Sequence, residues 1–182
     1  MSIVRQKETS TSVKVAFCGS MGSGKTYASN ELRNLLKDDC KILSIASPIK
    51  EIVHDMGQTG RACHIMVGTI GRQIDNSTWI SKLMDTVASY ERSGVHNIIV
   101  DDVRYENEAN VLKENGFTLI YLNTPWHVRF KRIRERTDDL KEHIEWFAHS
   151  SEIASEKIDK ACFDYIITEE SEVLEVLNTL VN

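Results

Sequence analysis

The chain of 182 residues has little proline and no long apolar run. Its two prolines, Pro48 and Pro125, each stand where a helix is expected to begin. No run approaches the ~18 apolar residues of a membrane-spanning helix, so no membrane partner is expected. The four cysteines are scattered, and no C-x-x-C pair is present for a metal or redox site. Such cysteines are typical of buried thiols in a reducing compartment, which indicates a cytoplasmic protein.

An excess of basic residues is also missing. The chain has 22 Lys and Arg against 27 Asp and Glu, a net charge of −5. Nucleic-acid binding usually needs a basic face, so no nucleic-acid partner is expected. The content of 41% hydrophobic and 27% charged residues is ordinary for a soluble domain. With no repeat or linker, residues 1–11 are expected to form a flexible polar tail and residues 12–182 a single domain.

Apolar runs alternate with segments of helical spacing along the whole chain. Such alternation, with continuously apolar strands, is typical of an α/β fold whose parallel sheet is covered by helices on both faces. Ser77 is expected to cap one of the helices. Residues 57–71 are expected to form short helices with a mobile connection, because Gly57, Gly60 and Gly68 disfavour one continuous helix. Strands are expected at 13–18, 41–45, 97–101, 117–122 and 163–168, and helices at 26–36, 49–56, 78–92, 106–113, 125–136 and 171–181.

The strongest pattern is a complete match to G-x-x-x-x-G-K-[ST] at residues 19–26, between an expected strand and an expected helix. Glycines let the backbone approach phosphate oxygens, and the N–H groups of such a loop face the anion. Lys25 would reach the β- and γ-phosphates of a nucleotide, and the Thr26 hydroxyl would bind Mg²⁺. The alternative is a glycine-rich turn without a ligand. ATP and Mg²⁺ are the expected cofactors, with the nucleotide bound by Gly19, Ser20, Met21, Gly22, Ser23, Gly24, Lys25 and Thr26.

Two carboxylates, Asp101 and Asp102, end the expected strand at 97–101. Ligands of open parallel sheets bind at the carboxyl edge of the strands. One aspartate could hold the Mg²⁺ shell and the other orient the attacking oxygen, so we assign Asp101 to the metal and Asp102 to catalysis. The neighbouring Arg104 suits a phosphorylated acceptor. The alternative is a solvated pair of turn residues.

The expected helix after Pro125 carries a stripe of arginines. Arg129, Arg132 and Arg136 share one flank, beside an apolar face formed by Trp126, Phe130 and Ile133. Guanidinium groups can stabilise a transferring phosphoryl group, so the three arginines are assigned to catalysis on a lid. The alternative is a helix face exposed to water.

Six runs along the chain match a known order of motifs: the loop at 19–26, residues 47–51, residues 71–75 with Trp79, residues 102–108, residues 149–152 and residues 163–167. The D-V-R-x-x-N-E motif at 102–108 and the H-x-S-E motif at 149–152 are more specific together than either is alone. In this order of motifs the chain resembles phage deoxynucleoside monophosphate (dNMP) kinases over about residues 13–180.

The resemblance implies a nucleoside monophosphate kinase fold, with a five-stranded parallel sheet in the order 2-3-1-4-5 and a lid. It implies transfer of the γ-phosphoryl group of ATP to a dNMP, with an acceptor-binding region at about 46–92 and a lid at about 129–155. A homodimer is among the expected assemblies, located in the host cytoplasm if the chain is phage-encoded. The substrate-binding residues that it implies are Lys50, Arg72, Trp79, Arg104, His149 and Glu152.

Two other functions stay open at this point. The acceptor region offers few aromatic residues to stack a base, and animal-type phosphomevalonate kinases resemble the chain in the same motif order. A kinase of another phosphorylated metabolite is therefore the first alternative. The second is a nucleotide-hydrolysing switch, which the arginine stripe and the lack of an N-K-x-D motif disfavour.

Overall fold

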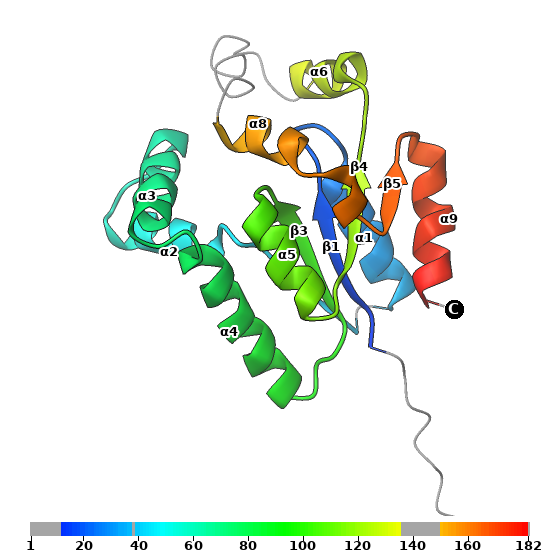
Figure 1. Cartoon of the computed structure of the whole chain (residues 1–182), viewed down its shortest axis with the longest axis horizontal. Coiled ribbons are helices and arrows are strands. Elements are labelled where there is room, and N and C mark those ends of the chain that lie inside the picture. The colour runs from blue at the N-terminus through cyan, green and yellow to red at the C-terminus, as the bar shows by residue number, and fades with distance from the viewer. Residues whose placement is uncertain (1–11, 38, 136–149, 182) are drawn as a thin grey trace, which may run out of the picture.

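The computed structural model describes residues 12–37, 39–135 and 150–181. Its centre is a five-stranded sheet in the order β2-β3-β1-β4-β5, in which every pairing is parallel (Figure 1). This confirms the expected sheet and its order. The strands are β1 (Lys14–Cys18), β2 (Lys41–Leu43), β3 (Ile98–Val103), β4 (Thr118–Leu122) and β5 (Tyr165–Ile167).

Helices cover both faces of the sheet, because residues of each central strand point alternately to opposite sides. In β3, for example, Ile98 and Val100 pack on one side and Ile99 on the other. The first side carries α2 (Ser47–Asp55), α4 (Thr78–Arg92) and α5 (Glu106–Glu114), and the second carries α1 (Lys25–Leu35) and α9 (Glu170–Val181).

Strand β1 lies at the centre of the sheet, where the chain runs to β2 on one side and later to β4 on the other. Its last residue, Cys18, pairs with Val103 of β3 and with Tyr121 of β4. The loops that follow β1, β3 and β4 therefore meet at one edge. Helices α6 (Trp126–Arg134) and α8 (Ser150–Lys157) lie over this edge (Figure 1). Ligands of open parallel sheets bind at such an edge.

The region of residues 57–71 differs from the sequence prediction. A single helix of 14 residues, α3 (Arg61–Ile74), occupies most of it. Gly57 and Gly60 lie before this helix with positive φ, but Gly68 lies within it and serves packing: a Cβ there would be 3.2 Å from the side chain of Ile49 in α2. Close approach of neighbouring helices, which local propensity does not report, explains this glycine.

Gly71 of α3 is predicted to be intolerant of any side chain. A Cβ there would lie 2.2 Å from the Trp79 ring. Although alanine favours helices, we expect Gly71→Ala to lower the free energy of unfolding by about 1–3 kcal/mol through overpacking. Gly68→Ala is the control, with a smaller loss, because its new Cβ would meet only side-chain ends at 3.2 and 3.3 Å. Urea unfolding measures both, and equal stability of Gly71→Ala and the wild type would contradict this packing.

Ser77 precedes α4, as expected, but its side chain does not cap the helix. Its hydroxyl donates to Asp75 Oδ1 at 2.7 Å, and its backbone N–H donates to the same oxygen at 2.8 Å. The nearby carboxylate thus competes successfully for the hydroxyl, and the predicted cap is wrong.

The cysteines also differ in part from the prediction. Cys18 and Cys40 are buried, whereas Cys63 and Cys162 are partly exposed, and all four are free thiols. In the part of the chain that the structure describes, no helix has the length and apolar character needed to cross a bilayer.

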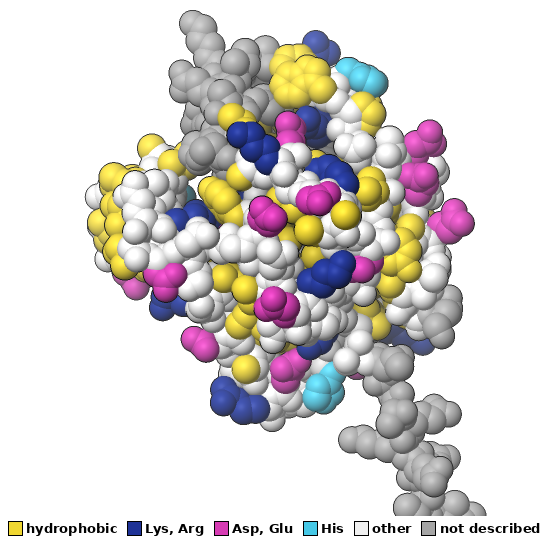
Figure 2. All heavy atoms as spheres, in the orientation of Figure 1, with side chains coloured by type: hydrophobic (Ala, Val, Ile, Leu, Met, Phe, Trp, Pro, Cys, Tyr) yellow, Lys and Arg dark blue, Asp and Glu magenta, His cyan; other side chains and the backbone are white. Residues whose placement is uncertain are grey.

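Several large apolar side chains stay exposed on α2 and α3, which belong to the expected acceptor region (Figure 2). On α3 they recur every fourth residue, at Met66, Ile70 and Ile74. At α2 they are Ile52, within the helix, and Met56, which directly follows it. The outer face of α3 is therefore largely apolar, while its opposite face turns inward toward the site described next.

Candidate active site

The loop at residues 19–26 joins β1 to α1 and has the backbone that a phosphate site needs. Gly22 and Gly24 have φ of +80° and +102°, values that favour glycine. Gly22 also lies under α6, because a Cβ there would be 2.9 Å from the Arg129 carbonyl oxygen. No side chain caps the N-terminus of α1, so its first N–H groups are available to an anion bound in the loop.

Ser23 adds an observation that suits an anion. Its Oγ is buried without a hydrogen-bond partner, one of two such side-chain atoms in the described residues, the other being Ser29 Oγ. A buried hydroxyl without a partner is costly. A phosphate oxygen in this loop is a partner of the right kind, so the residues present fit a bound nucleotide.

Lys25 turns back onto the loop. Its Nζ donates to the carbonyl oxygens of Gly19 at 2.6 Å and Ser20 at 3.2 Å. Burial, together with the positive charge of Arg104, lowers the pKa of Lys25 to about 8. An ammonium group with an unfavourable environment is a group that phosphate oxygens would stabilise.

We therefore expect ATP affinity to fall with rising pH above about pH 8. In the free protein Lys25 loses its proton in this range, whereas phosphate oxygens favour its charged form, so binding takes up a proton. The association constant should drop by up to about tenfold per pH unit above the free pKa. Calorimetric titration of ATP across this range tests it, with Lys25→Met as the control that binds weakly and shows no such slope. A flat profile in the wild type would contradict the assignment.

A cavity of about 730 Å³ opens beside the loop at the carboxyl edge of the sheet. This volume is typical of sites for small ligands. Most of the predicted site residues line it: residues 21–26, Lys50, Arg72, Asp101, Asp102 and Arg104. Residues that the sequence did not single out also line it, among them Ser44, Ile49, Arg61, His64, Ile65 and Tyr105.

The cavity gathers five cationic side chains from four different segments. Lys25 comes from the loop, Lys50 from α2, Arg61 and Arg72 from α3, and Arg104 from the end of β3. Among the described residues, the carboxylates of Asp101 and Asp102 line the same space, and those of Glu108 and Glu152 pair with its arginines from behind, so the cations still outnumber the carboxylates by five to four. The balance of charge favours an anionic ligand.

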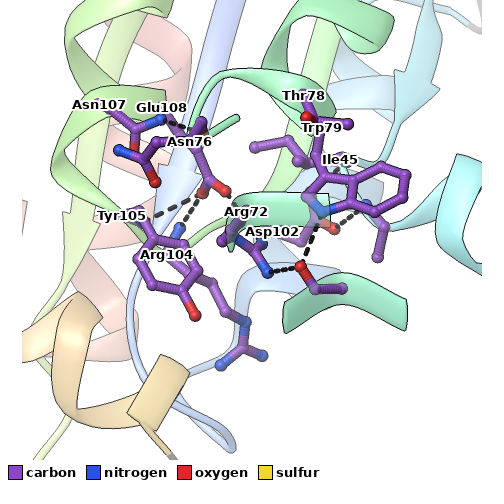
Figure 3. A network of polar contacts seen from close by, with 12 residues as sticks. Ile45, Arg72, Asn76, Thr78, Trp79, Asp102, Arg104, Tyr105, Asn107 and Glu108 are labelled. Carbon is purple, nitrogen blue, oxygen red and sulfur yellow. Dashed lines mark hydrogen bonds and ion pairs between the residues drawn. The ribbon is translucent and has the colours of Figure 1, made fainter. Parts of the chain in front are cut away.

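Arg72 is held firmly by its neighbours (Figure 3). One of its nitrogens donates to the Glu108 carboxylate at 3.3 Å and another to the Gly68 carbonyl at 3.2 Å, and its guanidinium lies 4.2 Å from the centre of the Tyr105 ring. Glu108 is buried and also accepts the backbone N–H groups of Arg104 and Tyr105. One carboxylate therefore positions both Arg72 and the turn that carries Arg104.

Asp101 and Asp102 have different surroundings. Asp102 accepts hydrogen bonds from Ser44 Oγ at 2.5 Å and from the amides of Ile45 at 2.7 Å and Ala46 at 3.0 Å. It fixes the loop that leads into α2, which favours a positioning role over the catalytic one expected from the sequence. Burial and the charge of Asp102 raise the pKa of Asp101, while Lys25 and Lys50 lower it. Asp101 is thus the carboxylate that a cation in the cavity would stabilise.

Thr26 and Asp101 line the same cavity, as the predicted magnesium site requires. Mg²⁺ is typically held by one or two protein oxygens together with substrate phosphates and water. Within the described ranges no group of three or more His, Cys, Asp or Glu side chains could form a metal site on its own. The hydroxyl and carboxylate oxygens fit Mg²⁺ in this shared mode.

Of the three arginines of the stripe, Arg132 contacts the phosphate loop directly, and Arg129 is linked to it through Glu156. Arg132 donates to the Gly22 carbonyl at 3.3 Å and pairs with Glu170. Arg129 pairs with Glu156 of α8 at 3.1 Å, and Glu156 also accepts from Ser20 Oγ. Arg136 lies outside the described residues. Of the apolar face expected on this helix, Ile133 is buried, whereas Trp126 is about half exposed.

A second cavity of about 600 Å³ adjoins the loop on its other side. It lies between α6 and the start of α9, and Tyr27, Val128, Ile167 and Val173 give it apolar walls. Ser23 and Gly24 belong to both cavities. On one side the loop borders this second cavity, with its partly apolar walls, and on the other it borders the cationic cavity.

Of the three other predicted substrate residues, Trp79 differs from the expectation, His149 falls outside the described chain, and Glu152 contacts residues that line the cavity. Trp79 is buried in the core, does not line the cavity, and donates from Nε1 to the Gly68 carbonyl at 2.9 Å (Figure 3). Trp79 of α4 therefore packs against α3 and does not contact a ligand in the cavity. His149 lies outside the described residues. Glu152 contacts Met21 and Arg104 at the cavity, as described below.

Arg61 was missed because residues 57–71 were not expected to form one helix. On a continuous helix, positions 61, 65, 68 and 72 follow the 3.6-residue period and share one face. All four line the cavity. The spacing of Arg61 and Arg72 was the signal that could have identified the pair.

Comparisons with known proteins agree with this architecture. The family described as AAA domain matches residues 15–158. No curated protein matches the chain. Among solved structures, a sugar kinase from Janibacter sp. HTCC2649 is 16% identical, with a TM-score of 0.60 over 94% of this chain and 95% of that chain.

Two shikimate kinases are also similar. The enzyme from Acinetobacter baumannii, in complex with shikimate, is 14% identical, with a TM-score of 0.53 over 94% of this chain and 92% of that chain. The enzyme from Bacteroides thetaiotaomicron is 14% identical, with a TM-score of 0.57 over 93% and 97%. At these identities the likeness shows the fold. The chain therefore belongs to the AAA domain family, and its fold is that of the P-loop kinases.

Proposed function

We propose that the protein transfers the γ-phosphoryl group of ATP to a small phosphorylated acceptor, a dNMP in the first instance. The observation that carries this proposal is the single cavity in which the phosphate loop meets Lys50, Arg61, Arg72 and Arg104. Donor and acceptor would each place a phosphate group at the same edge of the sheet. Positioning and electrostatic stabilisation are the main contributions that such a transfer needs.

The donor is assigned to the loop and the second cavity. Backbone N–H groups of the loop and Lys25 would hold the phosphates, and the apolar cavity beside Tyr27 and Val173 would take the nucleoside. Thr26 and Asp101 would hold Mg²⁺, which neutralises charge on the β- and γ-phosphates. Arg129 and Arg132, on the helix that packs over Gly22, would stabilise the transferring group.

The acceptor is assigned to the cationic cavity. An arginine fork binds a phosphate through paired hydrogen bonds, and Arg72 is already oriented by Glu108 and Tyr105. Arg104 and Arg61 lie closer to the loop, since both contact groups at Met21 or Glu152. The apolar body of the acceptor would then lie along Ile49 and Ile65.

A phosphorylated acceptor would need no carboxylate base, which agrees with the engagement of Asp102 elsewhere. A hydroxyl acceptor needs a carboxylate to take its proton. A phosphate monoester has its second pKa near about 6 and presents an ionised oxygen at neutral pH. The three donors on Asp102 thus favour a phosphate acceptor over a hydroxyl acceptor.

A different phosphorylated metabolite is the second candidate. Tyr105 already stacks on Arg72, so one of its ring faces is not open to a base. This arrangement is compatible with an acceptor that lacks a base, such as phosphomevalonate.

An ADP-release assay across dNMPs, NMPs and phosphomevalonate, with shikimate as a hydroxyl acceptor, tests the proposal. We expect ADP release that depends on one or more phosphorylated acceptors and none with shikimate. Transfer to shikimate alone would contradict the cationic cavity as a phosphate site. Rapid ATP hydrolysis without any acceptor would favour a nucleotide-hydrolysing switch instead.

A further inference from the structure

Glu152 of α8 places a carboxylate between the phosphate loop and the acceptor cavity. Its side chain is 3% exposed. It accepts the backbone N–H of Met21 at 2.6 Å, forms a charged hydrogen bond with Arg104, and lies 4.0 Å from Arg61 Nη2. The two arginines line the acceptor cavity, and Met21 belongs to the loop.

These donors are the ones that would hold a phosphate. A loop amide, an arginine fork and a second guanidinium form an anion site, and in this structure the anion is a side chain of the protein itself. A carboxylate and an incoming phosphate cannot share these donors, because the two like charges would lie close together in a buried site.

We infer that Glu152 is an internal substitute for the acceptor's phosphate, an inference that rests on the proposed function. With the cavity empty, Glu152 keeps Arg104 and the Met21 amide paired. When a phosphorylated acceptor binds, its phosphate takes these donors and the Glu152 side chain withdraws. Only ligands that carry enough negative charge to replace the carboxylate bind well, which makes Glu152 a residue that determines acceptor specificity.

The side chain can withdraw without loss of α8. Ser155 and Ile158 are buried, and Ser155 Oγ donates to the Glu152 carbonyl at 2.8 Å, so the backbone of this turn is anchored independently of the carboxylate. One turn further on, Glu156 offers a matched control. It also contacts the loop, through Ser20, but its arginine partner is Arg129 of α6.

Removal of the Glu152 carboxylate should change the affinity for phosphate in the direction opposite to that expected for a residue that binds substrate. Removing a direct ligand weakens binding, whereas removing a competing anion strengthens it. We expect Glu152→Gln to bind inorganic phosphate and dNMPs about tenfold or more tightly, the size of one charge-assisted hydrogen bond. Glu156→Gln should leave both affinities unchanged, because its carboxylate does not contact the acceptor arginines.

Calorimetry with saturating ADP on the loop measures these affinities for inorganic phosphate and for each of the four dNMPs. Weaker or unchanged binding by Glu152→Gln would overturn the inference, since Glu152 would then be a ligand or a permanent partner of Arg104. If that variant does not fold, Glu152→Asp serves instead: its shorter side chain should release the Met21 amide and tighten phosphate binding, and failure to do so also overturns the inference.

This measurement is independent of turnover. Tighter phosphate binding by Glu152→Gln, in a protein that phosphorylates no tested monophosphate, would leave the inference standing and the proposed reaction refuted. Transfer to a dNMP by a protein in which Glu152→Gln does not tighten binding would do the opposite.

Discussion

Replacing Lys25 with alanine is expected to reduce phosphoryl transfer by about 10²- to 10³-fold or more, the loss seen when one preorganised donor to a developing charge is removed. Lys25 is the first residue of α1, and its Nζ is within hydrogen-bond distance of the loop's own carbonyl groups. With nucleotide bound, the same group would face the β- and γ-phosphates. Steady-state turnover with ATP and the preferred acceptor measures the loss.

The fold should survive this change. Burial disfavours the Lys25 charge, as its lowered pKa shows, so removing the charge is not expected to destabilise the protein. Lys82→Ala, on the exposed side of α4, is the control and should keep full activity. A folded Lys25→Ala protein with near-normal turnover would remove the loop from the reaction.

Replacing Arg104 with alanine is expected to raise the acceptor KM by about 30- to 100-fold, the equivalent of a charged hydrogen bond of about 2–3 kcal/mol, with little change in the ATP KM. Arg104 lines the acceptor cavity and is the partner of Glu152. The acceptor KM of Arg104→Lys should lie between those of the wild type and Arg104→Ala, because lysine keeps the positive charge but cannot form the paired hydrogen bonds of a guanidinium group. An unchanged acceptor KM would exclude Arg104 from the acceptor site.

Arg104→Ala has a second effect, on stability, that a double variant can separate from its effect on acceptor binding. Arg104→Ala leaves the buried Glu152 carboxylate without its closest cation, which is costly in itself. The double variant Arg104→Ala with Glu152→Gln removes this cost. We expect it to recover stability but not acceptor affinity, and recovery of both would mean that Arg104 acts only by neutralising Glu152.

The features predictable from the sequence are those that local sequence encodes. The motif at residues 19–26 specifies its own backbone, because glycine is required at positive φ and a strand and a helix flank it. The five parallel strands followed from apolar runs that suit a sheet buried on both faces. Together with the resemblance, these patterns led to the observed strand order.

The remaining features depend on tertiary packing. Gly68 favoured a break in isolation, yet it stays helical because α2 packs closely against it. Trp79 belongs to a run that resembles the dNMP kinases, but its ring packs closely over Gly71 and is buried in the core. Asp101 and Asp102 are adjacent in the sequence, and hydrogen bonds from Ser44 Oγ and the amides of Ile45 and Ala46 distinguish Asp102 in the fold.

The acidic residues of α8 show the same limit. Glu152 and Glu156 contact Met21 and Ser20, which lie about 130 positions earlier in the chain. In the sequence, Glu152 belongs to the H-x-S-E motif, and the resemblance to dNMP kinases implied that it binds substrate. The negative charge of Glu152 indicates competition with a phosphate only because the fold places it beside Arg104 and Arg61.

The most direct test of the account follows the γ-phosphoryl group itself. The protein is incubated with ATP labelled at the γ-phosphate and Mg²⁺, with a mixture of monophosphates, and the labelled products are separated. We predict that the label appears in a diphosphate of the acceptor, at a rate that saturates with acceptor concentration. Label found only in free phosphate, at a rate independent of every acceptor, would contradict a kinase.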